Sequence, residues 1–80
     1  MPAILPVKLK SFTGKRSGTV DELKWEASCF EKVVFNLERS NDGIHFNLIG
    51  NITADSTDCN RPFFFTDKDP LPETNYYRLR

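Results

Sequence analysis

Apolar and polar side chains alternate in short runs along this chain. A period of two is typical of a β-strand with one buried face, because successive side chains of a strand point to opposite sides. The clearest run extends from Val33 to Glu38, where Val33, Phe35 and Leu37 share one side. Repeated short runs of this kind favour an all-β fold.

Six stretches are predicted strands, at a spacing near the ~8–12 residues typical of a sandwich or barrel. The one helical alternative covers residues 21–35, whose apolar positions fit a period of two better than 3.6. A change of phase at residues 10–11 indicates a bulge in the first strand. Asp21 and Glu22 open the second strand poorly, so it is expected to start late or carry a bulge. The predicted strands span residues 5–12, 23–27, 33–38, 44–52, 63–66 and 76–79.

Turn-forming residues separate the predicted strands. Residues 14–18 carry two glycines and are expected to form the first turn. Residues 40–43 have the sequence Ser-Asn-Asp-Gly, which strongly indicates a hairpin. Residues 53–60 are polar and are predicted to form a loop, and residues 67–70 form the next turn.

The same alternation predicts which side chains form the core. Trp25 shares its side with Leu23 and Ala27, so it is expected to be a buried anchor rather than a binding platform. Phe64 is expected on the outer face, because it lies between two inward-facing phenylalanines. The predicted structural core consists of Leu9, Phe12, Leu23, Trp25, Phe35, Leu37, Phe46, Phe65, Tyr76 and Leu79.

Composition excludes several classes of function. Eleven basic and eleven acidic residues give a net charge of zero, so no nucleic-acid partner is expected. Aromatic residues make up 12% of the chain, which argues against disorder. No apolar run approaches the ~20 residues that span a bilayer, so no membrane insertion is expected. The first six residues lack the basic and apolar regions of a secretory signal peptide.

No catalytic site, cofactor or metal is expected. His45 is the only histidine and has no partner in a nucleophile context, so neither a catalytic triad nor a zinc cage is supported. Asp42, Asp67 and Asp69 are expected at one end of the fold, where clustered carboxylates can bind calcium. They form no dense calcium-binding motif, so hydrogen bonding within turns is the preferred interpretation. The chain is predicted not to be an enzyme.

The two cysteines are expected at the opposite end. Cys29 follows the second predicted strand, and Cys59 lies in the loop after the fourth. Because consecutive antiparallel strands reverse direction, both loops lie at the same end. A disulfide in an oxidising compartment would close about 30 residues, worth roughly 3 kcal/mol. The alternative is two free thiols, if the loops hold the Cα atoms more than ~7 Å apart.

Several short motifs, in their order and spacing, resemble a fibronectin type III-like module. The version with these motifs occurs in large secreted and surface proteins of Bacteroidetes, next to the C-terminal sorting domains of type IX secretion. The resemblance implies an immunoglobulin-like sandwich of two antiparallel sheets. The motifs are Leu5-Pro6-Val7-Lys8-Leu9 with Phe12, Trp25-Glu26-Ala27-Ser28, Phe35-Asn36-Leu37-Glu38-Arg39-Ser40 with Asp42-Gly43 and Phe46, Phe65-Thr66-Asp67, Pro70-Leu71 and Thr74-Asn75-Tyr76-Tyr77-Arg78-Leu79.

The resemblance covers residues 1–80 as a single domain, with residues 1–4 as a linker. Such modules have a seventh strand, which is missing here because the chain stops at Arg80. The sixth strand would then present an open edge of unpaired backbone groups. One hypothesis is that a second copy pairs with this edge to form a homodimer. The alternative is a domain boundary set too early, which leaves a frayed last strand.

The resemblance also bears on two adjacent tyrosines. One of them is expected to form a tyrosine corner, with its hydroxyl bonded back to the preceding turn. The family's Pro-x-Thr-x-Tyr spacing favours Tyr76 for this role. Alternation with Leu79 instead favours Tyr77 as the inward ring.

The expected function is that of a non-catalytic structural module. It would link or present neighbouring domains of a larger secreted or cell-surface protein, and those domains would be its partners. The alternative is a carbohydrate-binding or adhesion module that contacts polysaccharide through exposed aromatic rings, with Phe64 as the glycan contact. Ser56 resembles an acceptor for Bacteroidetes O-glycosylation, because it lies in an Asp-Ser-Thr sequence within a predicted exposed loop.

Overall fold

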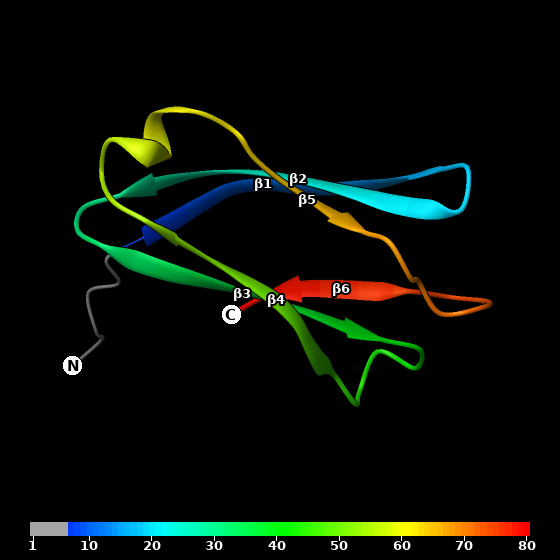
Figure 1. Cartoon of the computed structure of the whole chain (residues 1–80). Helices are drawn as coiled ribbons and strands as arrows, with labels where there is room; N and C mark the ends of the chain where they lie inside the picture. The colour runs from blue at the N-terminus through cyan, green and yellow to red at the C-terminus, as the bar shows by residue number, and fades with distance from the viewer. Residues whose placement is uncertain (1–6) are drawn as a thin grey trace.

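The computed structural model describes residues 7–80 and contains six strands in two antiparallel sheets, which confirms the prediction of an all-β sandwich. Figure 1 shows the two sheets as layers, one above the other. The linker predicted for residues 1–4, and the first two residues of the first predicted strand, lie outside the described residues. One sheet has the order β1 (Val7–Ser17), β2 (Val20–Cys29) and β5 (Phe63–Asp67). The other has the order β4 (Asn47–Ala54), β3 (Val33–Ser40) and β6 (Tyr76–Leu79), and a 3₁₀ helix, η1 (Asp58–Asn60), precedes β5.

The first hairpin is longer than predicted. The bulge expected near residues 10–11 is confirmed by a register shift between Leu9 and Ser11. The predicted turn at residues 14–18 is wrong, because β1 continues to Ser17 and pairs there with Val20. Only two residues join the strands, and Gly18 adopts a φ of +64° that suits glycine. The second strand accordingly starts at Val20 rather than late.

The second hairpin has a wider loop than predicted. β4 begins at Asn47, so the expectation of a strand from residue 44 is wrong. Asp42 accepts hydrogen bonds from the backbone N–H groups of Ile44 and His45, each at 2.8 Å. These bonds hold the chain in a turn where a ladder would otherwise begin. The alternation of inward and outward side chains in β4 therefore begins after Asn47 rather than at residue 44.

An aromatic cluster around Trp25 forms the centre of the core. Trp25 is completely buried, with Phe63 stacked on it at a centroid distance of 5.5 Å. Phe12 and Phe35 meet Trp25 edge-on, at 6.2 and 5.8 Å. Aromatic pairs in these geometries contribute more than their buried area alone. The buried apolar residues are Leu23, Trp25, Ala27, Val33, Phe35, Leu37 and Ala54, and Phe12, Phe63, Phe65, Tyr77 and Leu79 pack against them.

Three residues of the predicted core lie elsewhere. Leu9 is 48% exposed because its strand is at the edge of a sheet and nothing described covers it from outside. Tyr76 is also 48% exposed, since it lies on the opposite side of β6 from the inward-facing Leu79. Phe46 precedes β4 and lies beneath the guanidinium group of Arg78, which is 3.9 Å from the ring centroid.

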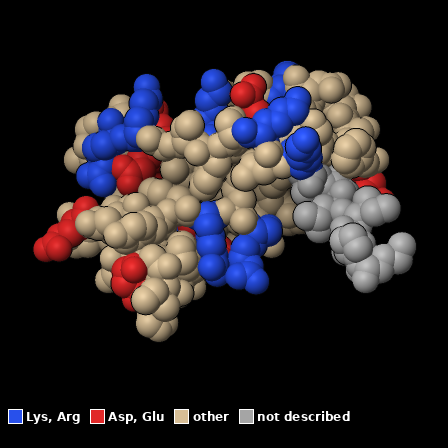
Figure 2. All heavy atoms as spheres, turned by 180° about the vertical axis from the view of Figure 1, so that it is seen from behind, with Lys and Arg blue, Asp and Glu red and all other residues tan. Residues whose placement is uncertain are grey.

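The sandwich has open strand edges. β1 and β6 are the edge strands on one side, and residues of both line the same groove. Arg80 and Asn36 exchange two backbone hydrogen bonds, so the N–H and C=O groups of Tyr77 and Leu79 point away from β3. Figure 2 shows basic and acidic side chains interspersed over one face. Among residues 7–80, no helix is long and apolar enough to cross a membrane.

Candidate functional site

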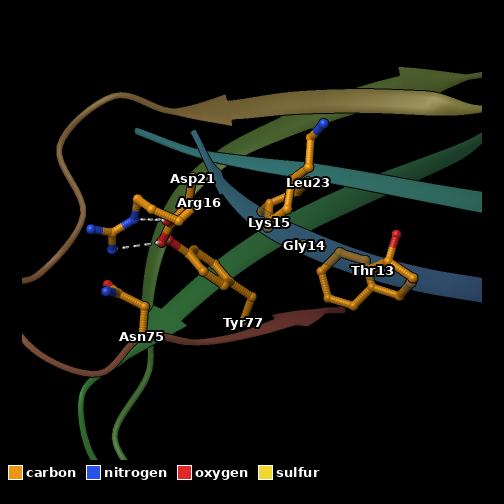
Figure 3. A pocket seen from close by; sticks show the side chains of 9 residues that line it. Thr13, Gly14, Lys15, Arg16, Asp21, Leu23, Asn75 and Tyr77 are labelled. Atoms are coloured by element: carbon orange, nitrogen blue, oxygen red, sulfur yellow. Dashed lines mark hydrogen bonds and ion pairs between the residues drawn. The ribbon is translucent and has the colours of Figure 1, made fainter. Parts of the chain in front are cut away.

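A group of charged and polar side chains lies between the two sheets, at the end that holds the β1–β2 turn. We call it the polar clamp. Its centre is the Tyr77 hydroxyl, which is 2.6 Å from a carboxylate oxygen of Asp21 and 2.7 Å from one of Asp67. Both aspartates are buried, with 7% and 5% of their surface exposed. Figure 3 shows Tyr77 pointing toward Asp21 and Arg16. The members of the clamp are Arg16, Asp21, Arg39, Asp67 and Tyr77.

Strand register brings the members of the clamp together. Asp21 of β2 is opposite Arg16 of β1 on one side and Asp67 of β5 on the other. In the second sheet, Arg39 of β3 is opposite Tyr77 of β6. Directly opposed residues share a face of a sheet, so all five side chains can reach the space between the sheets.

Each buried carboxylate has an arginine partner. Arg16 forms an ion pair with Asp21, and Arg39 Nη1 is 2.9 Å from both carboxylate oxygens of Asp67. Arg39 also donates a hydrogen bond to the backbone carbonyl of Asp69. Buried charges are stable only when they are paired and hydrogen-bonded, and both conditions are met here.

The clamp shifts the pKa values of its members. The hydrogen bond from Arg16 holds the pKa of the Asp21 carboxyl below its usual value. Burial opposes the charge on Asp67, but hydrogen bonds from Tyr77 and Arg39 outweigh it, and the pKa of Asp67 is also lowered. Burial and the two neighbouring carboxylates raise the pKa of the Tyr77 phenol well above its usual value. Tyr77 therefore stays a neutral donor between two charged acceptors.

These properties suit a structural tie between the sheets. A general base or nucleophile needs a lone pair or carboxylate free to meet a substrate. Here both carboxylates are occupied by arginine and by Tyr77, and the phenol is held in its protonated form. A groove of about 340 Å³ lies beside the clamp, lined in part by Phe12, Asn75 and Tyr77.

The tyrosine corner expected from the family resemblance takes a different form. Tyr77 is the inward ring, as alternation with Leu79 indicated, and its hydroxyl bonds to the carboxylates of Asp21 and of Asp67, where β5 ends and the predicted turn begins. Asn75 also holds the connection before β6, since its side chain accepts from the N–H of Leu71 and donates to its carbonyl. Tyr76, which the family spacing favoured, lies on the exposed side.

The three aspartates considered for calcium take part in local hydrogen bonding. Asp42 organises the loop between β3 and β4, and His45 Nδ1 lies 2.7 Å from its carboxylate. The hydrogen bond from His45 lowers the pKa of Asp42. The N–H of Asp69 donates to Asp67, which also belongs to the clamp. Within residues 7–80, no cluster of three or more metal-ligating side chains is found.

The opposite end of the sandwich holds the cysteines. Cys29 at the end of β2 and Cys59 in η1 form a disulfide, with their Cα atoms 5.7 Å apart. Ser56, the residue that resembles a glycosylation acceptor, is exposed in the loop that leads into η1. Asp55 shapes this loop by accepting hydrogen bonds from the N–H groups of Thr57 and Asp58.

The outer face of the β1–β2–β5 sheet carries a shallow groove of about 530 Å³, which we call the trough. Phe64 borders it and is 66% exposed, whereas its neighbours Phe63 and Phe65 are half-buried. The second strongly exposed phenylalanine, Phe30, lies at the bend after β2. The trough therefore brings an exposed aromatic ring and polar side chains together on the outer face of this sheet.

The comparisons give no named relative: no family model, curated protein or solved structure matches this chain. The resemblance to fibronectin type III-like modules stays a prediction.

Proposed function

We propose that this chain is a non-catalytic structural module of a larger secreted or cell-surface protein, where it links or presents neighbouring domains. The disulfide between Cys29 and Cys59 carries the proposal. Structural disulfides persist in oxidising compartments and are rare in the cytosol. They are also a common means of stabilising small domains, whose cores are limited by their size.

The arrangement of the polar groups supports the same function. The disulfide joins β2 to the connection between β4 and β5 at one end, and the clamp joins the two sheets at the other. A spacer must keep its shape while neighbouring domains move, and ties at both ends restrict sliding of the sheets. The buried charged groups serve these ties rather than a reaction.

The two-sheet architecture supports the fibronectin type III-like assignment within this proposal. The resemblance implies a sandwich of two antiparallel sheets, and six strands form two such sheets here, with Trp25 of one quoted motif buried on β2. The Bacteroidetes origin and the link to type IX secretion belong to the proposal on the basis of that resemblance alone. Its partners would be the adjoining domains, together with a second copy at the open edge of β6.

Export to an oxidising compartment tests the proposal. The chain is produced once in the bacterial periplasm and once in the cytosol, and free thiols are counted by alkylation and mass spectrometry. We expect no free thiol on Cys29 or Cys59 in the periplasmic protein. Two free thiols there would overturn the proposal. A third preparation, secreted by a Bacteroidetes host, shows by mass spectrometry whether Ser56 carries added mass.

A further inference from the structure

The trough has a regular construction. Two cross-strand rows of outward side chains border it: Thr13, Lys24 and Phe64 form one row, and Lys15, Glu22 and Thr66 form the other. Between them run Gly14, Leu23 and Phe65, which alternate with the outward residues along their strands. Leu23 is buried, so its side chain contributes to the core and its backbone to the floor. The trough crosses three strands, a width of about 10 Å between the outer two.

The charges of the side chains that border the trough do not sum to zero. Glu22 is 3.8 Å from Lys15, so these two charges form an exposed ion pair. Lys24 has no carboxylate partner among the described residues, and its ammonium nitrogen lies 5.9 Å from the centroid of the Phe64 ring. One positive charge therefore remains beside an exposed aromatic face. Figure 3 shows Lys15 pointing away from Tyr77, which places this surface on the opposite side of β1 from the clamp.

This combination favours a sugar over other classes of ligand. An apolar peptide or a lipid chain needs pockets for its apolar groups, and the floor here is backbone. Pyranose rings have an apolar face that stacks on aromatic rings and an edge of hydroxyl groups that needs hydrogen-bond partners. Phe64 offers the first, and the Thr13 and Thr66 hydroxyls offer the second.

We infer that the trough binds an acidic polysaccharide, with Phe64 stacked on a sugar ring and Lys24 paired with the carboxylate of a uronate residue. The positive charge of Lys24 favours acidic over neutral polysaccharides, because a uronate carboxylate can pair with it and a neutral glycan cannot. Lys15 and Glu22 contact hydroxyl groups on the other side of the trough. This site is independent of the spacer function, because neither the disulfide nor the clamp takes part in it.

Affinity electrophoresis through gels that contain polygalacturonate or alginate tests the inference, with neutral xylan as the comparison. We expect the whole chain to be retarded by the uronates and not by xylan. Phe64→Ala should weaken binding about tenfold, as the loss of one stacking contact predicts. Lys24→Gln should weaken it too and remove most of its dependence on salt.

Matched variants make the result decisive. Phe30→Ala removes a similarly exposed ring that does not line the trough, so it should leave retardation unchanged. Phe64→Tyr keeps the ring and should retain binding. If Phe64→Ala fails to fold, the loss of retardation and of salt dependence in Lys24→Gln carries the test. The inference is overturned by no retardation on either uronate, by equal retardation on xylan, or by equal effects of Phe64→Ala and Phe30→Ala.

Discussion

Tyr77 has one phenolic proton and two carboxylates within hydrogen-bond distance. The proton can serve only one of them at a time, so the second carboxylate depends on its arginine. Arg39 offers Asp67 two contacts of 2.9 Å from one nitrogen. The hydroxyl and the arginines thus share the task of keeping two like charges close together inside the fold.

Replacement of the Tyr77 hydroxyl should therefore destabilise the protein. Tyr77→Phe leaves Asp21 and Asp67 without their shared donor, and we expect the free energy of unfolding to fall by about 1–3 kcal/mol. Urea denaturation followed by Trp25 fluorescence measures the change. Tyr76→Phe is the control, because Tyr76 is half-exposed and outside the clamp. Equal stabilities of the two variants would contradict a structural role for the hydroxyl.

The stability of the protein should fall at both extremes of pH. The pKa values of Asp21 and Asp67 are lowered by folding, so their contribution is present above the ordinary value of 3.8 and is lost as the pH falls toward the folded values. The pKa of Tyr77 is raised by folding, so its contribution is complete below the ordinary value of 10.0 and declines as the pH rises past it.

The alkaline change separates the contribution of Tyr77 from that of the carboxylates. Asp42 and Asp55 also have lowered pKa values and contribute to the acid change. Urea midpoints measured across the pH range should therefore show an alkaline decline that is smaller in Tyr77→Phe and an acid decline that persists. An alkaline decline of the same size in both proteins would show that another group causes it.

At the scale of the element, the sequence predicted strands well where burial is one-sided. The alternation of β2 and β3 placed Leu23, Trp25, Phe35 and Leu37 correctly inside. Prediction was poorer at strand ends, because hydrogen bonding rather than burial determines where a strand begins and ends. β1 runs through Gly14 because β2 pairs with it, and β4 starts late because Asp42 holds the loop.

The clamp was the part of the site that sequence analysis missed. Asp21 looked like a poor strand opening, because a buried aspartate is costly unless partners from other strands meet it. Arg16 is only five residues from Asp21, but Tyr77 is 56 residues from it, and no local pattern brings them together. One signal was present: Asp21 and Arg39 occupy inward positions of their strands, and a charged residue there implies a buried partner.

Gly50 of β4 lies against the ring of Phe65 in the opposite sheet. A Cβ atom at this position would lie 2.6 and 2.8 Å from atoms of the Phe65 ring in the opposite sheet. Gly50→Ala should therefore force the ring or the strand to move and lower the free energy of unfolding by about 1–3 kcal/mol. Thermal unfolding measures this, with the exposed neighbour Asn51→Ala as the control. An unchanged melting temperature would contradict the close approach.

At the scale of the whole molecule, the disulfide is expected to account for a large share of stability. It closes a loop with a sequence separation of 30 residues, for which the chain-entropy model gives about 3–4 kcal/mol. The double variant Cys29→Ser/Cys59→Ser should lose this amount in urea denaturation. The native chain with a reductant should match the double variant. Stability that does not respond to either change would contradict the contribution of the bridge.

The open edge of β6 offers a place where two copies of the chain can associate. The backbone groups of Tyr77 and Leu79 that point outward can pair with another strand. If two copies pair there, sedimentation velocity should show a dimer fraction that grows with protein concentration. A single monomer species at the highest concentration tested would refute the homodimer.

The disulfide also limits how far the chain can be drawn out. If neighbouring domains pull on the two ends, the residues between Cys29 and Cys59 stay outside the line of force, since the bridge bypasses them. A fully extended residue spans about 3.3–3.6 Å, so the sequence separation of 30 between the cysteines corresponds to roughly 100 Å of chain that cannot extend. In the oxidised module the loop therefore cannot extend under force, and reduction of the disulfide makes its length available.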